Sequence, residues 1–212
     1  MAGKPVIEAE FGPRFPRRGN AFSRAFGRVL MRLLGWRIVG SPPNEPKLMV
    51  VAIPHTSNWD GVILLLAMLA AGLDLRWVGK HTLFRGYTGK LLRWAGGVSV
   101  NRAKAQDFVG SVAQTYRDSD SLALIIAPEG TRKPTARWKT GFHRIAQQAG
   151  VPIVIGYMDY ARKTVGFGPG MDASEEFDDY VAQMAHFIRD VRPRHPQNFI
   201  LPQRENEPSE QR

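Results

Sequence analysis

A histidine and an aspartate separated by four residues are the clearest candidates for chemistry in this sequence. They are His55 and Asp60, in a polar segment over residues 54–61 that lies between two apolar runs. A histidine can act as a base near neutral pH when a partner holds one ring nitrogen and the other is free. A carboxylate across a turn can hold the Nδ1 side and leave Nε2 facing a substrate hydroxyl. The same spacing also fits a histidine bonded within a turn and an aspartate that caps a helix.

The sequence offers this pair no nucleophile of a familiar kind. It contains neither a Gly-x-Ser-x-Gly segment nor any cysteine, so a covalent serine or cysteine mechanism is not indicated. The pair would instead have to activate a hydroxyl of the substrate. The lack of cysteine also excludes a disulfide framework and thiolate-rich zinc sites. We expect no metal site and no cofactor.

The charge of the chain points to an anionic partner. Its 212 residues include 29 Lys and Arg against 19 Asp and Glu, a net charge of +10. This balance implies a membrane surface, a nucleic acid or a phosphorylated substrate, and charge alone does not choose among them. The length fits one domain with a full core. Because the first residues carry charges and prolines instead of an apolar run, we expect no secretory signal.

Apolar runs and helical periodicity alternate along the chain. Strands are expected over residues 36–39, 48–53, 75–78, 98–100, 121–127, 151–157 and 164–167, and helices over 20–36, 62–73, 88–94, 106–116, 142–149 and 175–188. Such alternation predicts an α/β sandwich, with a largely parallel central sheet flanked by helices. His55 would then lie at the end of a strand, and Asp60 near the start of a helix.

The helix expected over residues 20–36 is amphipathic and basic. Phe22, Phe26 and Leu33 recur at helical spacing, and Arg24 and Arg28 lie on the other side. Arginines interrupt the run, so it cannot span a bilayer, but it could lie on an anionic membrane surface. The alternative is a helix that packs on its own domain with its arginines in water.

The chain therefore divides into four parts. We expect a loosely ordered basic arm over residues 1–19, the amphipathic membrane-surface helix over 20–36, the α/β domain over 37–202 and a frayed tail over 203–212. The arm is rich in proline, glycine and arginine and shows no periodicity.

Four strand-end segments carry polar residues that could converge, because sites in open α/β sheets lie beyond the carboxyl ends of the strands. The segments are residues 55–60, Asn101 and Arg102, residues 128–133, and the stretch over 151–153. Arg102 and Arg132 could each present a planar fork of donors to phosphate oxygens. Either could equally be a solvated surface charge.

Read together, these segments resemble the four sequence blocks of the glycerolipid acyltransferases. The blocks stand in this order over roughly residues 48–157, as His-Thr-Ser-Asn-Trp-Asp (55–60), Gly-Val-Ser-Val-Asn-Arg (97–102), Pro-Glu-Gly-Thr-Arg (128–132) and Val-Pro-Ile (151–153). This family includes enzymes that acylate glycerol phosphate and lysophosphatidate. The resemblance implies an α/β acyltransferase domain that moves an acyl chain from a thioester, on coenzyme A or acyl carrier protein, to a lysolipid hydroxyl.

The resemblance also implies roles for single residues. His55 would be the general base and Asp60 its orienting partner. Arg102 would grip the phosphate of the acceptor, and four further residues would bind or position substrate. These are Glu129, Gly130, Thr131 and Arg132.

The sequence thus predicts a peripheral enzyme on the cytoplasmic face of the membrane that makes phosphatidate from 1-acyl-glycerol-3-phosphate. Its partners would be a lysophospholipid, an acyl thioester, an anionic membrane surface contacted through residues 20–36 and, as an open option, acyl carrier protein. Another lysolipid acceptor remains an alternative, as does a non-catalytic module that binds phospholipid. Nucleic acid is disfavoured because the basic residues are not interleaved with aromatic residues on recognisable sheet motifs.

Overall fold

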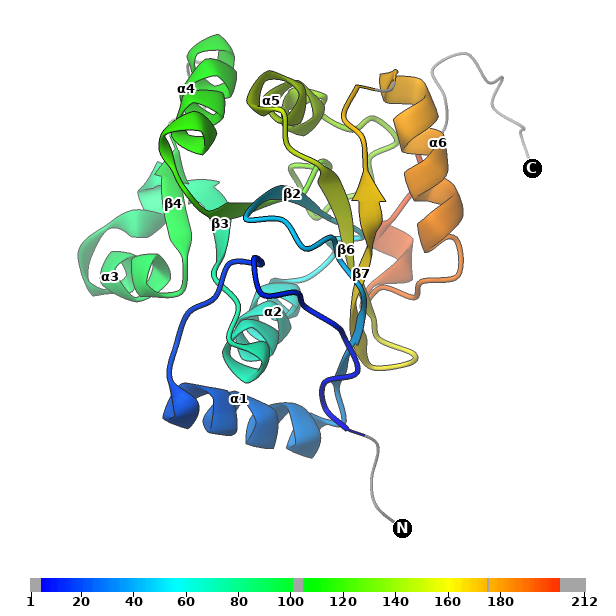
Figure 1. The fold of residues 1–212 in the computed structure, drawn as a ribbon. Helices are drawn as coiled ribbons and strands as arrows, with labels where there is room; N and C mark the ends of the chain where they lie inside the picture. Colours follow the sequence, from blue (N-terminus) through cyan, green and yellow to red (C-terminus); the bar gives the residue numbers. More distant parts are fainter. Residues whose placement is uncertain (1–4, 101–104, 175, 203–212) are drawn as a thin grey trace.

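A central sheet of seven strands organises the computed structural model, which describes residues 5–100, 105–174 and 176–202 (Figure 1). The strand order across the sheet is β1-β7-β6-β2-β5-β3-β4. The strands are β1 (Arg37–Gly40), β2 (Lys47–Ala52), β3 (Leu75–Lys80), β4 (Gly97–Val100), β5 (Leu122–Ile126), β6 (Ile153–Asp159) and β7 (Thr164–Met171). Neighbouring strands are parallel except β6 and β7, which pair antiparallel. The expected α/β class with a largely parallel sheet is confirmed.

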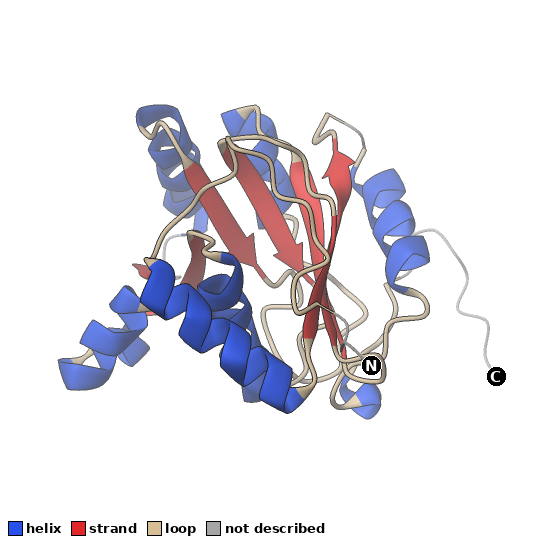
Figure 2. Cartoon of the chain, turned by 60° about the horizontal axis from the view of Figure 1, so that its bottom comes forward, coloured by secondary structure: helices blue, strands red, loops and turns tan. Residues whose placement is uncertain are grey.

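Helices cover both faces of this sheet. They are α1 (Ala21–Leu34), α2 (Asn58–Ala71), α3 (Gly86–Trp94), α4 (Ala105–Asp118), α5 (Gly141–Ala149) and α6 (Phe177–Ile188), with short 3-10 turns at His81–Phe84 and Pro196–Asn198. Helices α1 and α2 lie together on one face, and α4, α5 and α6 lie on the other (Figures 1 and 2). The sheet is therefore buried on both sides, as the continuous apolar runs of its central strands require.

Strand β2 shows how one run of apolar residues serves both layers. Leu48 and Val50 belong to the core beneath α1 and α2, whereas Met49 and Val51 belong to the core beneath α4, α5 and α6. Successive side chains of a strand point to opposite faces, so a strand with a core on each side is apolar at every position. This central strand leads directly to His55.

Residues 5–19 differ from the loosely ordered arm that the composition suggests. Ile7 pairs with Ile38 of β1 in a parallel bridge, and the Arg18 N–H donates to the Gly72 carbonyl. Phe15 is only 1% exposed, in the core beneath α1 and α2. Burial of a few apolar side chains therefore outweighs the local signals of disorder. The expected tail over 203–212 lies outside the described residues.

Helix α1 turns much of its apolar side outward. An Asn20–Ser23 capping box begins the helix, and its inner face packs on α2 through Gly27 and Met31. The side chains of Phe22 and Leu33 are 79% and 76% exposed. Phe26 and Val29 continue the same exposed stripe, which we call the α1 stripe. The alternative in which this apolar side packs on the domain is therefore wrong for these four residues.

The helices of this fold are too short or too polar to span a membrane, where the structure describes them. Within the described ranges, no helix is both long enough and apolar enough to cross a bilayer.

Candidate active site

The turn between β2 and α2 carries the first of the candidate residues. Helix α2 begins at Asn58, four residues earlier than the sequence pattern indicates, and Ser57 is its N-cap. Asp60 therefore lies in the first turn of the helix. Its Oδ2 accepts hydrogen bonds from the backbone N–H groups of Thr56 and Ser57, both at 2.9 Å. A carboxylate at this position satisfies otherwise unpaired helix donors and faces the positive end of the helix dipole.

The same carboxylate holds the histidine. His55 Nδ1 lies 3.1 Å from Asp60 Oδ2. The His55 side chain is 33% exposed and that of Asp60 only 6%, so the carboxylate is shielded while part of the ring stays accessible. Asp60 thus belongs to the capping box at the start of α2 and is also the partner of His55, so the two explanations of the spacing hold together.

Tyr160 is a third member of this group that sequence reasoning missed. Its hydroxyl donates to Asp60 Oδ1 at 2.7 Å, across 100 positions in the chain. Tyr160 comes directly after β6, the parallel neighbour of β2, so the fold brings it to the turn. No local pattern signals this contact. Burial and the Asp60 carboxylate raise the pKa of Tyr160, which keeps the phenol protonated as a donor.

These contacts fix the charge of Asp60. Its burial favours the neutral carboxyl, but hydrogen bonds from His55, Tyr160 and the Ser57 N–H outweigh that effect and hold the pKa of Asp60 below its ordinary value. The group is therefore an anion at neutral pH. A carboxylate so placed orients an imidazole and stabilises positive charge that develops on it.

Glu129 reaches the same turn from the next strand. It follows β5, and its Oε1 accepts a hydrogen bond from the backbone N–H of His55 at 3.0 Å. Its Oε2 is buried and has no hydrogen-bond partner among the described residues. Burial raises the pKa of Glu129 to about 7. Glu129 thus supports the backbone of His55 with a carboxyl group that is close to its midpoint at neutral pH.

The other residues of this block lie in the loop between β5 and α5. Gly130 adopts a φ of 63°, a conformation that favours glycine, at the sharp turn after Glu129. Thr131 and Arg132 are exposed, and the Thr131 hydroxyl accepts from the Lys133 N–H at 3.2 Å. Within the described ranges, no hydrogen bond or ion pair joins Thr131 or Arg132 to His55 or Asp60. Arg102 lies outside the described residues.

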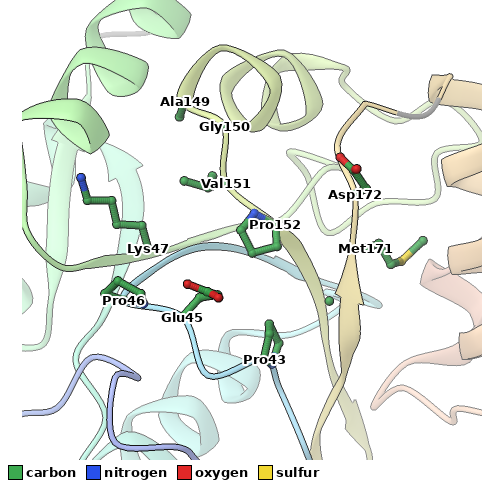
Figure 3. A pocket seen from close by; sticks show the side chains of 11 residues that line it. Pro43, Glu45, Pro46, Lys47, Ala149, Gly150, Val151, Pro152, Met171 and Asp172 are labelled. Carbon is green, nitrogen blue, oxygen red and sulfur yellow. The ribbon is translucent and has the colours of Figure 1, made fainter.

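The segment over residues 151–153 does not join this site, which corrects the expected convergence of four segments. It lies at the start of β6, where Ile153 pairs with Met49 near the start of β2. Because β2 and β6 are parallel, this end is opposite to the one at which His55 follows β2. Val151 and Pro152 instead line a surface pocket together with Lys47 (Figure 3).

Comparison with known proteins gives the family. Residues 40–157, more than half of the chain, match the family described as Acyltransferase. The chain belongs to this acyltransferase family. It is also similar to a 1-acyl-sn-glycerol-3-phosphate acyltransferase of Cocos nucifera, with 28% identity over 143 residues. That match covers 65% of this chain and 46% of the coconut protein, so it spans less than half of the relative.

A solved structure supports the fold of this acyltransferase-family chain. The crystal structure of the 1-acyl-sn-glycerophosphate acyltransferase PlsC from Thermotoga maritima matches with a TM-score of 0.50 and 17% sequence identity. The match covers 80% of this chain and 74% of that one. The expected resemblance to glycerolipid acyltransferases is confirmed at the level of family and fold.

The family match encloses only part of the site of this acyltransferase. His55, Asp60 and Glu129 lie inside residues 40–157, whereas Tyr160 and helix α1 lie outside them. In the described part of the chain, no three or more His, Asp or Glu side chains gather in a way that could hold a metal ion.

Proposed function

We propose that the protein is an O-acyltransferase that moves a fatty acyl group from acyl-CoA or acyl-ACP to the free hydroxyl of a lysophospholipid. The preferred acceptor is 1-acyl-glycerol-3-phosphate, and the product is phosphatidate. One observation carries the proposal: His55 Nδ1 is held by the buried Asp60 carboxylate at 3.1 Å, at the end of a central strand. Membership of the acyltransferase family and the name of the coconut relative support the choice of reaction.

His55 would act as the general base. With Nδ1–H bonded to Asp60, Nε2 accepts the proton of the acceptor hydroxyl while its oxygen attacks the thioester carbonyl. When the tetrahedral intermediate collapses, the carbon–sulfur bond breaks and the imidazolium returns the proton to the leaving thiolate. The products are an ester and a free thiol. This route forms no acyl-enzyme and uses neither a metal nor a cofactor, so its rate rests on positioning and charge stabilisation.

The remaining residues of the blocks would bind substrate. Arg132 and Arg102 are the proposed contacts for the acceptor phosphate, and Gly130 and Thr131 would shape the loop beside it. Arg132 is exposed in the loop that follows Glu129, and within the described residues no carboxylate pairs with it. A guanidinium that is free of an internal partner can offer a planar fork to an anion.

The α1 stripe would place the protein on the membrane that holds its acceptor. Exposed Phe22, Phe26, Val29 and Leu33 can enter the headgroup region, while basic side chains such as Arg24 and Arg32 are attracted to anionic lipid. We infer peripheral attachment to the cytoplasmic face. Acyl carrier protein remains an open partner, and no nucleic acid is proposed.

Acyl transfer is tested by following the release of free thiol. The assay supplies long-chain acyl-CoA or acyl-ACP with lysophosphatidate and a panel of other lysolipids, and compares wild type with His55→Ala. Loss of a general base should lower kcat by about a hundredfold or more. His186→Ala is the matched control, because His186 is exposed near the end of α6 and should be silent.

Two results would count against the proposal. Full turnover by a correctly folded His55→Ala protein would remove His55 as the base. Vesicle binding by the wild type without transfer from any donor to any acceptor would favour the non-catalytic phospholipid-binding module.

A further inference from the structure

The segment after α6 is fixed against the His55 turn, although it lies outside the family match. The Tyr160 N–H donates to the Arg192 carbonyl at 2.8 Å, and the His195 N–H donates to the Thr56 hydroxyl at 3.3 Å. Thr56 is only 3% exposed. Hydrogen bonds therefore hold the backbone on both sides of Arg194. Arg192, two positions before it, is bonded to Tyr160 at the end of β6, and His195 is bonded to the turn that carries His55.

Arg194 extends from this pinned segment over two aromatic rings beside the site. Its Cζ lies 5.4 Å from the ring centroid of Trp59 and 5.8 Å from that of Tyr160. Trp59 precedes Asp60 in the chain, and the Tyr160 hydroxyl donates to Asp60. Cation–π contacts of this kind hold a guanidinium in place and restrict its freedom. The guanidinium also donates a side-chain hydrogen bond to the Tyr160 hydroxyl, and its remaining N–H groups are available to a ligand.

Among the residues that the structure describes, no acid neutralises the charge of Arg194. Within the described part of the chain, no carboxylate lies within ion-pair distance of Arg194. The Asp60 carboxylate in the site already has partners at both oxygens, which are Thr56, Ser57, His55 and Tyr160. Arg162 shows the contrast, because its Nη1 is bonded to Asp159 Oδ2 at 2.6 Å. Arg194 is therefore an exposed, oriented cation beside the proposed base, and its N–H groups that are not bonded to Tyr160 can donate to an anion.

We propose that Arg194, held over Trp59 and Tyr160, forms a subsite for a phosphate monoester of one of the substrates. A guanidinium fork matches two phosphate oxygens and gives charge-assisted hydrogen bonds. Two substrates of the proposed reaction carry this group: lysophosphatidate, in its headgroup, and acyl-CoA, in its 3′-phosphate. The inference rests on the proposed function for its substrates, but its binding chemistry depends only on the geometry of Arg194.

Initial rates separate the two sources. Wild type, Arg194→Gln, Arg194→Lys and Arg192→Gln are compared with lysophosphatidate against monoacylglycerol, and with acyl-CoA against acyl-dephospho-CoA. Arg194→Gln should raise the KM of one phosphate-bearing substrate roughly tenfold to a hundredfold, with little change in kcat. The KM of the analogue without that phosphate should change less than twofold. The substrate whose KM rises identifies the source of the phosphate.

The two other variants serve as controls. Arg192 is exposed two positions away and only its backbone carbonyl is bonded to Tyr160, so Arg192→Gln should match wild type. Arg194→Lys keeps the charge but loses the fork, so its KM should lie between those of wild type and Arg194→Gln. An unchanged thermal midpoint shows that each variant is folded. Equal KM values for wild type and Arg194→Gln with both phosphate-bearing substrates would overturn the subsite.

A binding measurement keeps this inference separate from the proposed function. If the wild type transfers no acyl group, the proposed function fails, and tryptophan fluorescence then tests the subsite directly because Trp59 lies against Arg194. The probes are glycerol 3-phosphate against glycerol, and adenosine 3′,5′-bisphosphate against adenosine 5′-phosphate. A phosphate-dependent change that is lost in Arg194→Gln supports the subsite. The absence of such a change, or its persistence in Arg194→Gln, overturns it.

Discussion

At the scale of single residues, both oxygens of Asp60 are fully engaged. Oδ2 faces two backbone N–H groups and His55 Nδ1, and Oδ1 accepts from Tyr160. The donors on opposite sides leave the carboxylate little freedom to rotate, so the orientation of the His55 ring is fixed by the start of α2 as much as by the pair itself. Asp60 can therefore accept from the backbone at the start of α2 and hold the His55 ring at the same time.

The His55–Asp60 part of this group could be predicted from the sequence, because both residues lie within one turn. Tyr160 and Arg194 could not, since they reach the turn only through the parallel pairing of β6 with β2 and through the segment after α6. Their position depends on the tertiary structure, and no short-range spacing encodes it. The sequence indicates Glu129 only as part of a block after a strand, and nothing in it indicates the bond from the His55 backbone.

Tyr160→Phe tests how much the hydrogen bond from the Tyr160 hydroxyl to Asp60 contributes to acyl transfer. The change removes the hydrogen bond to the Asp60 carboxylate and the hydroxyl to which Arg194 donates. It keeps the ring beneath Arg194, so His55 should lose orientation while Arg194 stays over its two aromatic rings. We expect kcat for acyl transfer to fall about tenfold with KM nearly unchanged, in line with the value of such a bond. Tyr87→Phe is the control, because Tyr87 is exposed on α3. A rise in KM with kcat unchanged, or no change in either constant, would argue against a positioning role.

Glu129→Gln should change how stability depends on pH. In the folded protein the pKa of Glu129 is raised from 4.5 to about 7 by burial. Between these values the folded state binds more protons than the unfolded chain, so this contribution to stability is complete below pH 4.5 and is lost as pH rises through about 7. Relative to Glu129→Gln, wild type should lose up to about 3 kcal/mol between pH 4.5 and pH 8. Urea unfolding at both pH values measures the difference, and parallel losses in the two proteins would contradict it.

At the scale of elements, the helices and strands of the core follow from periodicity, whereas the structure of segments without periodicity does not. Residues 5–19 carry Pro and Gly yet are pinned by Ile7 and Phe15. The segment over 151–153 lies at the start of β6, whereas the other described blocks follow a strand. Whether this segment lies near His55 depends on which end of the strand it occupies. In a parallel sheet, a segment that precedes a strand lies at the opposite edge from a segment that follows one.

The contact between α1 and α2 depends on one glycine. A Cβ built at Gly27 would lie 2.4 Å from the backbone nitrogen of Ala70, so the two helices would have to separate. Gly27→Ala should therefore lower the free energy of unfolding by about 1–3 kcal/mol, despite the better helix propensity of alanine. Gly110→Ala is the matched control, because its Cβ would meet nothing within 4 Å in α4. That variant should gain about 0.5–1 kcal/mol. Denaturant unfolding measures both free energies. A higher free energy of unfolding for Gly27→Ala as well as for Gly110→Ala would contradict the close packing of α1 on α2.

At the scale of the whole molecule, net charge and exposed apolar surface point to the same kind of partner. The chain carries +10, and α1 presents the exposed α1 stripe between basic residues. An apolar stripe alone would favour any hydrophobic surface, and positive charge alone would favour any polyanion. An anionic bilayer satisfies both features at once, because its interface accepts apolar side chains and its headgroups attract arginine.

Vesicle binding separates these two contributions. Wild type should bind vesicles that contain phosphatidylglycerol more tightly than pure phosphatidylcholine vesicles, and the excess should shrink as salt rises from 0.01 to about 0.5 M because exposed charges are screened. Phe22→Ser with Leu33→Ser should weaken binding to both vesicle types at least about tenfold, since two largely exposed apolar side chains are removed from the stripe. Ile200→Ser is the control, because Ile200 is an exposed apolar residue far along the chain. Sedimentation that shows equal binding by the double variant and the control would exclude α1 as the docking element, whereas salt-independent binding would show that burial of the stripe acts without help from the charge.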